Sequence, residues 1–302
     1  MRIDNFILFC KSYSGDVTRV MDLWESIKLF NKDKIPFYIS VPQKELEYFK
    51  SFFSEDAKKI VWVTDEDIIK RCPSPSLEKY AKWDGRLSQQ VVKSEFWRLF
   101  EGEISYLCLD SESQFIRDFY EIDYLLDGVP YTVFHQNKEL LQLAENKKIK
   151  KVGIHYLNES CNLKNIFKRA GPNYDFGPTP VIWSSKVWKS LDENYLKPNN
   201  LTFWDAIEMA PSELRWYGEA LIAYKAIPIY PIEPIFRVYH YDWQYFTNKK
   251  MGETNKTLCL NYLGILKQSN WEYERDFGGQ AKRKSLLSKA VRVLRRIAAH
   301  FR

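Results

Sequence analysis

Apolar strand-like runs alternate with helical patterns along the first third of the chain, and this alternation restricts the folds that it can adopt. The runs that predict strands are 6–10, 36–41, 60–64 and 104–109, and those with helical spacing are 16–30, 43–53 and 88–100. Strands joined by helices of this length form βαβ units and a largely parallel sheet. Because the runs show little alternation of apolar and polar residues, we expect strands that are covered on both faces. The sequence therefore predicts an α/β fold in which helices flank the sheet.

The pattern becomes mixed after residue 119. Strands are predicted at 131–134, 151–156 and 181–183, helices at 185–191 and 212–225, and a proline-broken extended run at 227–240. The segment 64–88 contains Pro73 and Pro75 and is expected to form an irregular loop over the edge of the sheet.

Composition excludes several classes of protein. Apolar residues make up 45% of the 302 residues and charged residues 28%, which is ordinary for a globular protein. The five cysteines are scattered without a Cys-x-x-Cys pair, so neither a zinc motif nor a redox motif is indicated and a reducing cytoplasm is expected. The amino-terminal residues lack the apolar core of a signal peptide, and no apolar run is long enough to span a bilayer. We expect a cytoplasmic protein that is soluble or attached to a membrane from outside.

The positive charge is concentrated in the last residues. Segment 281–302 has eight basic residues and no acidic ones, so residues 1–280 carry −2 of the chain's total of +6. Residues 285–301 can form an amphipathic helix whose apolar side includes Leu286, Leu294 and Phe301. A basic helix of this kind is typical of an anionic membrane surface. Nucleic-acid binding and packing onto a partner chain are the alternatives, and membrane attachment without nucleic-acid binding is preferred.

The predicted strand 104–109 ends directly in Asp110-Ser111-Glu112. Two carboxylates at the carboxyl end of a strand can face one divalent cation, and Mg²⁺ and Mn²⁺ prefer oxygen ligands. Ligands bind at this edge of open α/β sheets. The alternative is a polar turn, because Asp and Ser are common turn residues.

The order of these elements resembles the GT-A fold of nucleotide-sugar glycosyltransferases, a Rossmann-like mixed sheet flanked by helices. Within that fold the chain is similar to a family of bacterial proteins linked to surface polysaccharides. The motifs that carry the resemblance are Lys11-Ser12-Tyr13 with Asp16, Gln89-Gln90-x-x-Lys93, Asp110-x-Glu112, Gly177-Pro178-Thr179-Pro180, and Ser212-Glu213 with Tyr217-Gly218-Glu219. The resemblance implies a glycosyltransferase domain over 1–277, divided into a nucleotide-binding half (1–120) and an acceptor half (121–277), and a basic tail over 280–302.

The resemblance also implies a divalent cation, Mn²⁺ or Mg²⁺, bound near the diphosphate of the donor. Asp110 would contact ribose or metal, Glu112 would bind metal directly, and His240 would complete the set of ligands. Glu112 stands where Asp is commoner, which leaves the geometry of the metal open. His240 is flanked by Tyr239 and Tyr241, and a buried structural role is its alternative.

The remaining implied contacts hold the nucleotide. Lys11, Ser12, Tyr13 and Asp16 would bind base and ribose, with Tyr13 stacking on the base. The alternative for Asp16 is a helix N-cap. A second group, Gln90 and Lys93, lies on one helix face, and Lys93 would reach the phosphates. A solvated lysine is the alternative for that residue.

A glycosyltransferase that inverts its sugar uses a carboxylate as general base. Glu213 and Glu219 are the candidates on the predicted helix 212–225, and six residues is poor same-face spacing, so only one is expected to face the site. The alternative for Glu213 is a favourable interaction with the helix dipole.

These expectations combine into one hypothesis, a metal-dependent, inverting glycosyltransferase. It would transfer a sugar from a nucleotide-sugar donor to a growing bacterial surface glycan, free or lipid-linked, on the inner face of the cytoplasmic membrane. A nucleotidyltransferase is one rival, although Lys11-Ser12-Tyr13-Ser14-Gly15 is a poor phosphate-binding loop. The other rival is a non-catalytic, membrane-associated scaffold protein.

Overall fold

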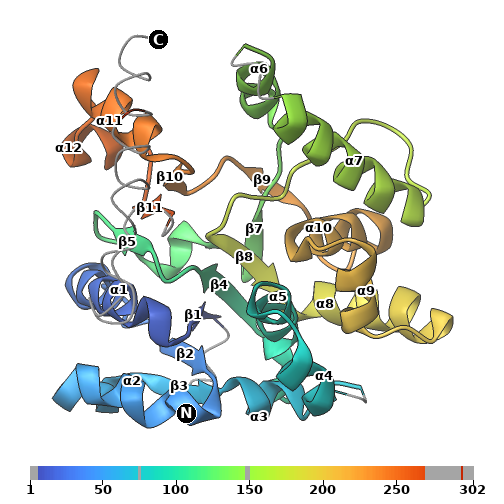
Figure 1. The fold of residues 1–302 in the computed structure, drawn as a ribbon, viewed down its shortest axis with the longest axis horizontal. Helices are drawn as coiled ribbons and strands as arrows, with labels where there is room; N and C mark the ends of the chain where they lie inside the picture. The colour runs from blue at the N-terminus through green and yellow to red at the C-terminus, as the bar shows by residue number, and fades with distance from the viewer. Residues whose placement is uncertain (1–5, 74–75, 147–149, 269–293, 295–302) are drawn as a thin grey trace.

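A five-stranded sheet forms the centre of the computed structural model, which describes residues 6–73, 76–146, 150–268 and 294. Its strand order is β3-β2-β1-β4-β8 (Figure 1). The strands are β1 (Phe6–Lys11), β2 (Phe37–Val41), β3 (Val61–Thr64), β4 (Ser105–Leu109) and β8 (Val181–Ser184). The first four are mutually parallel, whereas β8 runs antiparallel to β4. The carboxyl ends of four strands and the start of β8 therefore meet at one edge.

Each face of the sheet carries its own hydrophobic core. In β1, Phe6, Leu8 and Cys10 pack with α1 (Val17–Phe30) and α2 (Leu46–Phe53). The alternate residues Ile7 and Phe9 pack into the core on the opposite face. The helices that contribute most to this second core are α3 (Asp65–Ile69), α5 (Gly85–Glu95), α8 (Ser185–Leu191), α9 (Phe203–Met209) and α10 (Glu213–Tyr224), and Leu163 of a further helix also belongs to it. The alternation follows from the two-residue period of a strand.

Two three-stranded sheets extend the central one. One has the order β6-β7-β9 and the other β10-β11-β5. Their strands are β5 (Ser113–Phe115), β6 (Leu125–Leu126), β7 (Val129–Val133), β9 (Tyr230–Ile232), β10 (Phe236–Tyr239) and β11 (Gly264–Lys267). The other helices are α4 (Ser76–Lys82), α6 (Lys138–Asn146), α7 (Lys150–Ile166), α11 (Asp242–Lys250) and α12 (Asn255–Leu258).

The α/β class, with a parallel-rich sheet flanked by helices, is confirmed. The strand predicted at 151–156 is wrong, because these residues belong to helix α7. The apolar alternation of that short window fits a strand, but Gly153, Tyr156, Ser160 and Leu163 are the buried positions and recur at helical spacing.

The loop predicted over 64–88 is also wrong in part. It contains α3 and α4, and α5 begins at Gly85. Helix α3 starts immediately after β3 because the Thr64 hydroxyl accepts from the Asp67 backbone N–H and the Asp67 carboxylate accepts from the Thr64 N–H, a capping box.

The basic tail lies outside the described residues, apart from Leu294, so the tail helix stays a prediction. The division into a nucleotide half and an acceptor half stays a prediction as well. Within the described ranges, no helix has the length and apolarity needed to cross a bilayer.

Helix α10 approaches the loop before β8 so closely that Gly218 admits no side chain. A Cβ atom at Gly218 would lie 2.1–2.2 Å from ring atoms of Phe176. In an unhindered helix a Gly→Ala change stabilises by up to about 1 kcal/mol. We expect Gly218→Ala instead to destabilise by about 1–3 kcal/mol through overpacking, measured as a lower urea midpoint at unchanged m-value.

Gly85→Ala is the matched control, because nothing lies within 4 Å of a Cβ atom at that helical glycine. A midpoint for Gly218→Ala equal to or above that of the control would contradict the close contact.

Candidate functional site

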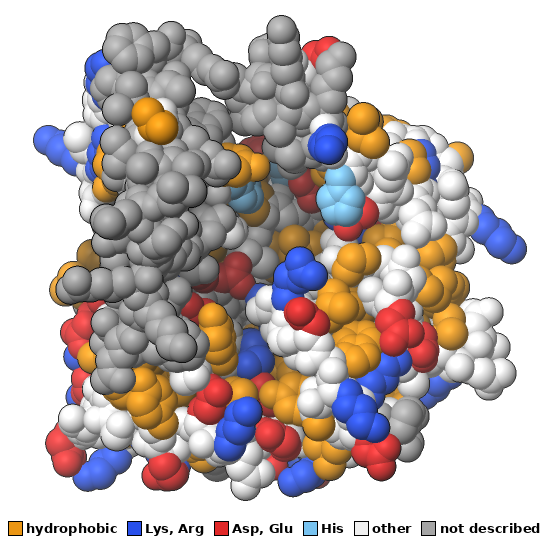
Figure 2. Space-filling model, in the orientation of Figure 1, with side chains coloured by type: hydrophobic (Ala, Val, Ile, Leu, Met, Phe, Trp, Pro, Cys, Tyr) orange, Lys and Arg blue, Asp and Glu red, His pale blue; other side chains and the backbone are white. Residues whose placement is uncertain are grey.

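A cavity of about 1100 Å³ opens at the edge where the parallel strands end. Ser12, Pro42, Glu66 and Asp110 line it from the ends of β1, β2, β3 and β4 respectively. Thr179, just before β8, closes the same edge. Figure 2 shows charged side chains of both signs gathered around a hollow near the middle of this face. The position of the cavity agrees with the rule that open α/β sheets bind ligands at the carboxyl ends of their strands.

Most of the residues singled out in the sequence line this one cavity. They are Lys11, Ser12, Tyr13, Asp16, Gln90, Lys93, Asp110, Glu112 and Glu213. They come from the end of β1 and the segment between β1 and α1, from α5, from the turn after β4 and from the start of α10. Glu219 and His240 are the two candidates outside the lining.

Asp110 is held by a partner on each carboxylate oxygen. Its Oδ1 lies 2.6 Å from Nζ of Lys93, and its Oδ2 accepts a hydrogen bond from the Thr179 hydroxyl. Although partial burial alone would raise the pKa of Asp110, the Lys93 ammonium and these hydrogen bonds lower it. Asp110 is therefore a carboxylate at neutral pH.

Lys93 is 4% exposed, which is unusual for a lysine and contradicts the solvated alternative. Burial alone would lower the pKa of its ammonium group, but the charge of Asp110 outweighs burial and raises the pKa. The residue is fixed through its backbone too, because the hydroxyl of Tyr106 in β4 donates to the Lys93 carbonyl at 3.0 Å. Lys93 is thus a permanent positive charge at the cavity.

A hydroxyl contact joins the turns after β1 and β4. Ser111 Oγ donates to Ser12 Oγ at 3.0 Å, and both side chains are buried. This contact fixes the position of the acidic triplet relative to the segment Ser12–Asp16.

Asp65 is a site residue that sequence reasoning missed. It is fully buried at the start of α3 and accepts from Lys11 Nζ at 2.8 Å, Ser40 Oγ at 2.5 Å and Tyr80 OH at 2.5 Å. Lys11 and Tyr80 both line the cavity, so Asp65 positions two of its walls. The available signal was an acidic residue directly after the strand 61–64, the same pattern that identified Asp110.

Glu213 begins α10 at the cavity wall. Its backbone N–H donates to Gln90 Oε1 at 3.3 Å, which ties α10 to α5. Removal from solvent raises the pKa of the Glu213 carboxyl, and the nearby Asp110 adds to this effect while Lys93 opposes it. A carboxyl group with a raised pKa in a cavity is suited to proton transfer.

Asp16 occupies the N-cap position of α1, as its alternative interpretation predicted, but its side chain makes no capping hydrogen bond. Its carboxylate instead pairs with Arg19 at 2.7 Å. Tyr13 is 47% exposed at the rim, and its ring covers Gly15. An aromatic ring at the rim of a cavity can stack on a flat group of a ligand.

Glu219 is buried behind the cavity. Its carboxylate forms a two-point ion pair with Arg169, at 2.6 Å to Nε and 2.7 Å to Nη2. This pairing holds the start of the loop before β8 against α10, which is a structural role.

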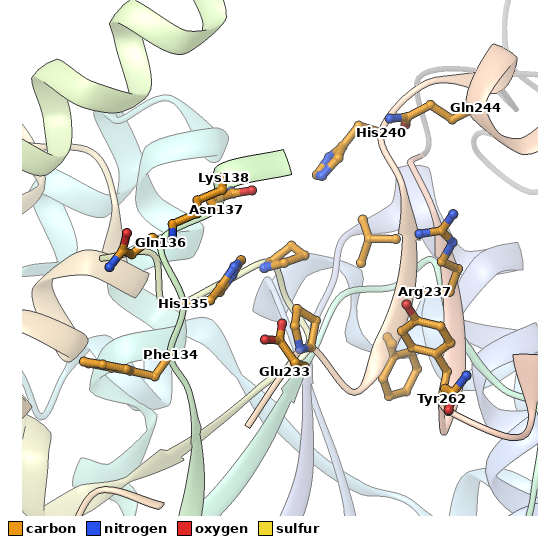
Figure 3. A pocket seen from close by; sticks show the side chains of 15 residues that line it. Phe134, His135, Gln136, Asn137, Lys138, Glu233, Arg237, His240, Gln244 and Tyr262 are labelled. Carbon is orange, nitrogen blue, oxygen red and sulfur yellow. The ribbon is translucent and has the colours of Figure 1, made fainter. Parts of the chain in front are cut away.

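His240 lines a second cavity, of about 980 Å³. Figure 3 shows His240, His135 and Glu233 pointing toward the same space from segments that follow β10, β7 and β9. Pro178 lines this second cavity while the next residue, Thr179, lines the first. The same short stretch of backbone therefore forms part of the wall of both cavities.

The expected ligands do not fit a divalent cation. Both oxygens of Asp110 are engaged, and His240 lines the other cavity. Among the described residues no three His, Cys, Asp or Glu side chains are grouped as a metal site would require. Of the three expected ligands, Asp110 and Glu112 line the first cavity and His240 does not, so the predicted set is not assembled at one place.

Residues 6–256 match a protein family described as a family of unknown function, DUF6492. The chain belongs to this family. No curated protein matches it. Among solved structures the DUF6492 chain is similar to the apo form of mouse xyloside xylosyltransferase 1, with 8% sequence identity and a TM-score of 0.46 over 88% of this chain and 98% of that one.

The pair Lys93–Asp110 contributes to the stability of this DUF6492 protein. Lys93→Met leaves the carboxylate without its cation, and we expect a loss of roughly 2–4 kcal/mol at pH 7, somewhat below the range for fully buried pairs because Asp110 is 21% exposed. Urea unfolding measures the loss.

The pH dependence of this loss of stability shows whether the loss has an ionic origin. Because the folded-state pKa of Asp110 is lowered, the contribution of the pair is present above the unfolded pKa of about 4 and is lost as the pH falls through the lower folded value. The difference in the free energy of unfolding between wild type and Lys93→Met should therefore become smaller in acid. A difference that is independent of pH would contradict an ionic origin.

Proposed function

We propose that this protein is a glycosyltransferase of the GT-A type that transfers a sugar from a nucleotide-sugar donor to a bacterial surface glycan. One observation carries the proposal. A single cavity at the carboxyl edge of four parallel strands combines an exposed aromatic ring (Tyr13), a buried lysine–carboxylate pair (Lys93–Asp110) and a carboxyl group with a raised pKa (Glu213).

The donor would lie along the strand ends. Tyr13 stacks on the base, and Ser12 and Asp16 lie beside it in the segment after β1 to accept or donate hydrogen bonds to ribose. Lys93 lies deeper, where it can meet the diphosphate. Lys11 is held by Asp65 at 2.8 Å and supports the same wall.

Glu213 would act as general base in an inverting reaction. It removes the proton from an acceptor hydroxyl as that oxygen attacks the anomeric carbon, and the bond from this carbon to the phosphate oxygen breaks. The nucleoside diphosphate leaves with the bonding electron pair.

The acceptor glycan would occupy the second cavity and extend its reacting hydroxyl to Glu213 at the first. The lining of the second cavity combines amide, imidazole and aromatic side chains, among them Gln136, Gln244 and Tyr262, which suit the hydroxyl groups and apolar faces of sugars. The acceptor is a growing O-antigen, capsule or lipooligosaccharide-type glycan, free or lipid-linked. The basic tail would hold the enzyme on the cytoplasmic face of the membrane through anionic lipids.

The first test is donor binding. A thermal-shift screen of the full chain against UDP, GDP, CMP and dTDP should give a rise in melting temperature for at least one of them by mass action. No shift with any nucleotide would sink the transferase proposal and favour a non-catalytic scaffold.

Glu213→Gln tests the base. We expect kcat to fall by about 10²–10⁴ while the Kd of the donor stays unchanged. In the wild type, kcat should fall as the pH drops through the raised pKa of Glu213, since the base must be ionised, and Glu213→Gln should lack this acid limb. The control is Glu219→Gln, which disturbs the pair with Arg169 away from the cavity: its remaining activity should keep the acid limb.

His240→Ala tests the acceptor side. We expect the acceptor KM to rise about five- to tenfold through loss of one hydrogen bond, with an unchanged donor Kd. His155→Ala is the matched control, because that side chain is 74% exposed on α7 and lines neither cavity. Weaker donor binding in His240→Ala would assign the second cavity to the donor.

A further inference from the structure

The Lys93 ammonium has hydrogen-bonding capacity that the protein does not use. An ammonium group has three N–H donors. Within the described part of the chain its single hydrogen-bond acceptor is Asp110 Oδ1, at 2.6 Å. Two donors are therefore left for a ligand, and Lys93 lines the cavity.

The other basic groups at the cavity differ from Lys93. Lys11 donates both to Asp65, at 2.8 Å, and to the Ser12 carbonyl, at 2.6 Å. Arg86 is 82% exposed and lies 3.8 Å from Asp84, and Lys44 is exposed as well. A charge in water is screened by salt and a buried charge is screened much less, so Lys93 is the strongest of these sites for a phosphate.

The same ammonium group occupies the place where a cation would bind Asp110. A divalent cation on this carboxylate would have to displace Lys93 or stand beside its positive charge. The Thr179 hydroxyl donates to the second oxygen, so each carboxylate oxygen already has a partner from the protein.

We propose that Lys93 replaces a divalent cation in this site, so that the protein binds nucleoside diphosphates without metal. The inference rests on the proposed function. Asp110 keeps Lys93 protonated and oriented, and the two remaining N–H groups bind phosphate oxygens and stabilise the charge that the leaving diphosphate gains. Asp110 is then a positioning residue for Lys93.

Isothermal titration with UDP, GDP, CDP and dTDP, each in EDTA and in Mn²⁺, tests this inference on the full chain. For the diphosphate that binds, we expect the two Kd values to agree within about twofold. In EDTA the matching nucleoside should bind about ten- to a hundredfold more weakly than the diphosphate, as expected for charge-assisted hydrogen bonds. This comparison uses only wild-type protein and is independent of the folding of any variant.

Variants locate the contact. Lys93→Met should remove the difference between diphosphate and nucleoside, whereas Lys44→Met, which changes another lysine of the cavity lining, should retain it. Lys93→Arg keeps the charge and should retain part of the difference. If Lys93→Met still binds the diphosphate more tightly than the nucleoside by the full wild-type factor, the inference is overturned.

The outcomes separate the inference from the function. Diphosphate binding that weakens more than tenfold in EDTA overturns metal independence and leaves the transferase proposal standing. Absence of nucleotide binding in both conditions overturns the proposed function and the inference with it.

Discussion

The ion pair between Lys93 and Asp110 is the constraint on which the site depends. It joins α5 to the end of β4, and the Thr179 hydroxyl adds the segment before β8 to the same carboxylate. Three elements are thereby held at one point, and the segment of Thr179 is 69 residues away from Asp110 in sequence. Removing one partner of a buried pair leaves an uncompensated charge, so the pair has to be kept or replaced as a unit.

The location of the site could be predicted from the sequence because it depends on topology. Parallel strands bring their carboxyl ends to one edge, so the residues after 6–11 and 105–109 had to meet there. The partners of these residues could not be predicted. The pairing of Lys93 with Asp110 requires the rotation and depth of α5, and the role of Asp65 requires that Ser40, Lys11 and Tyr80 converge on one buried carboxylate.

Side-chain direction explains the remaining differences. Six residues on a helix turn through about 600°, which places Glu213 and Glu219 on different sides of α10. The structure has Glu213 at the cavity and Glu219 paired with Arg169. The position of His240 depends on the small sheet β10-β11-β5, whose order includes strands more than 100 residues apart in sequence. Local pattern contains no information about such pairings.

The shared wall between the two cavities has a consequence for how their selectivities can change. Pro178 and Thr179 are neighbours in the chain but belong to different cavities, and Phe176 in the same loop packs on Gly218 without free space. A substitution that moves this loop toward one cavity must withdraw it from the other. The ligand preferences of the two cavities are thus linked. To change the preference of one cavity and leave the second cavity unchanged, a substitution has to be made in the wall that faces away from this loop.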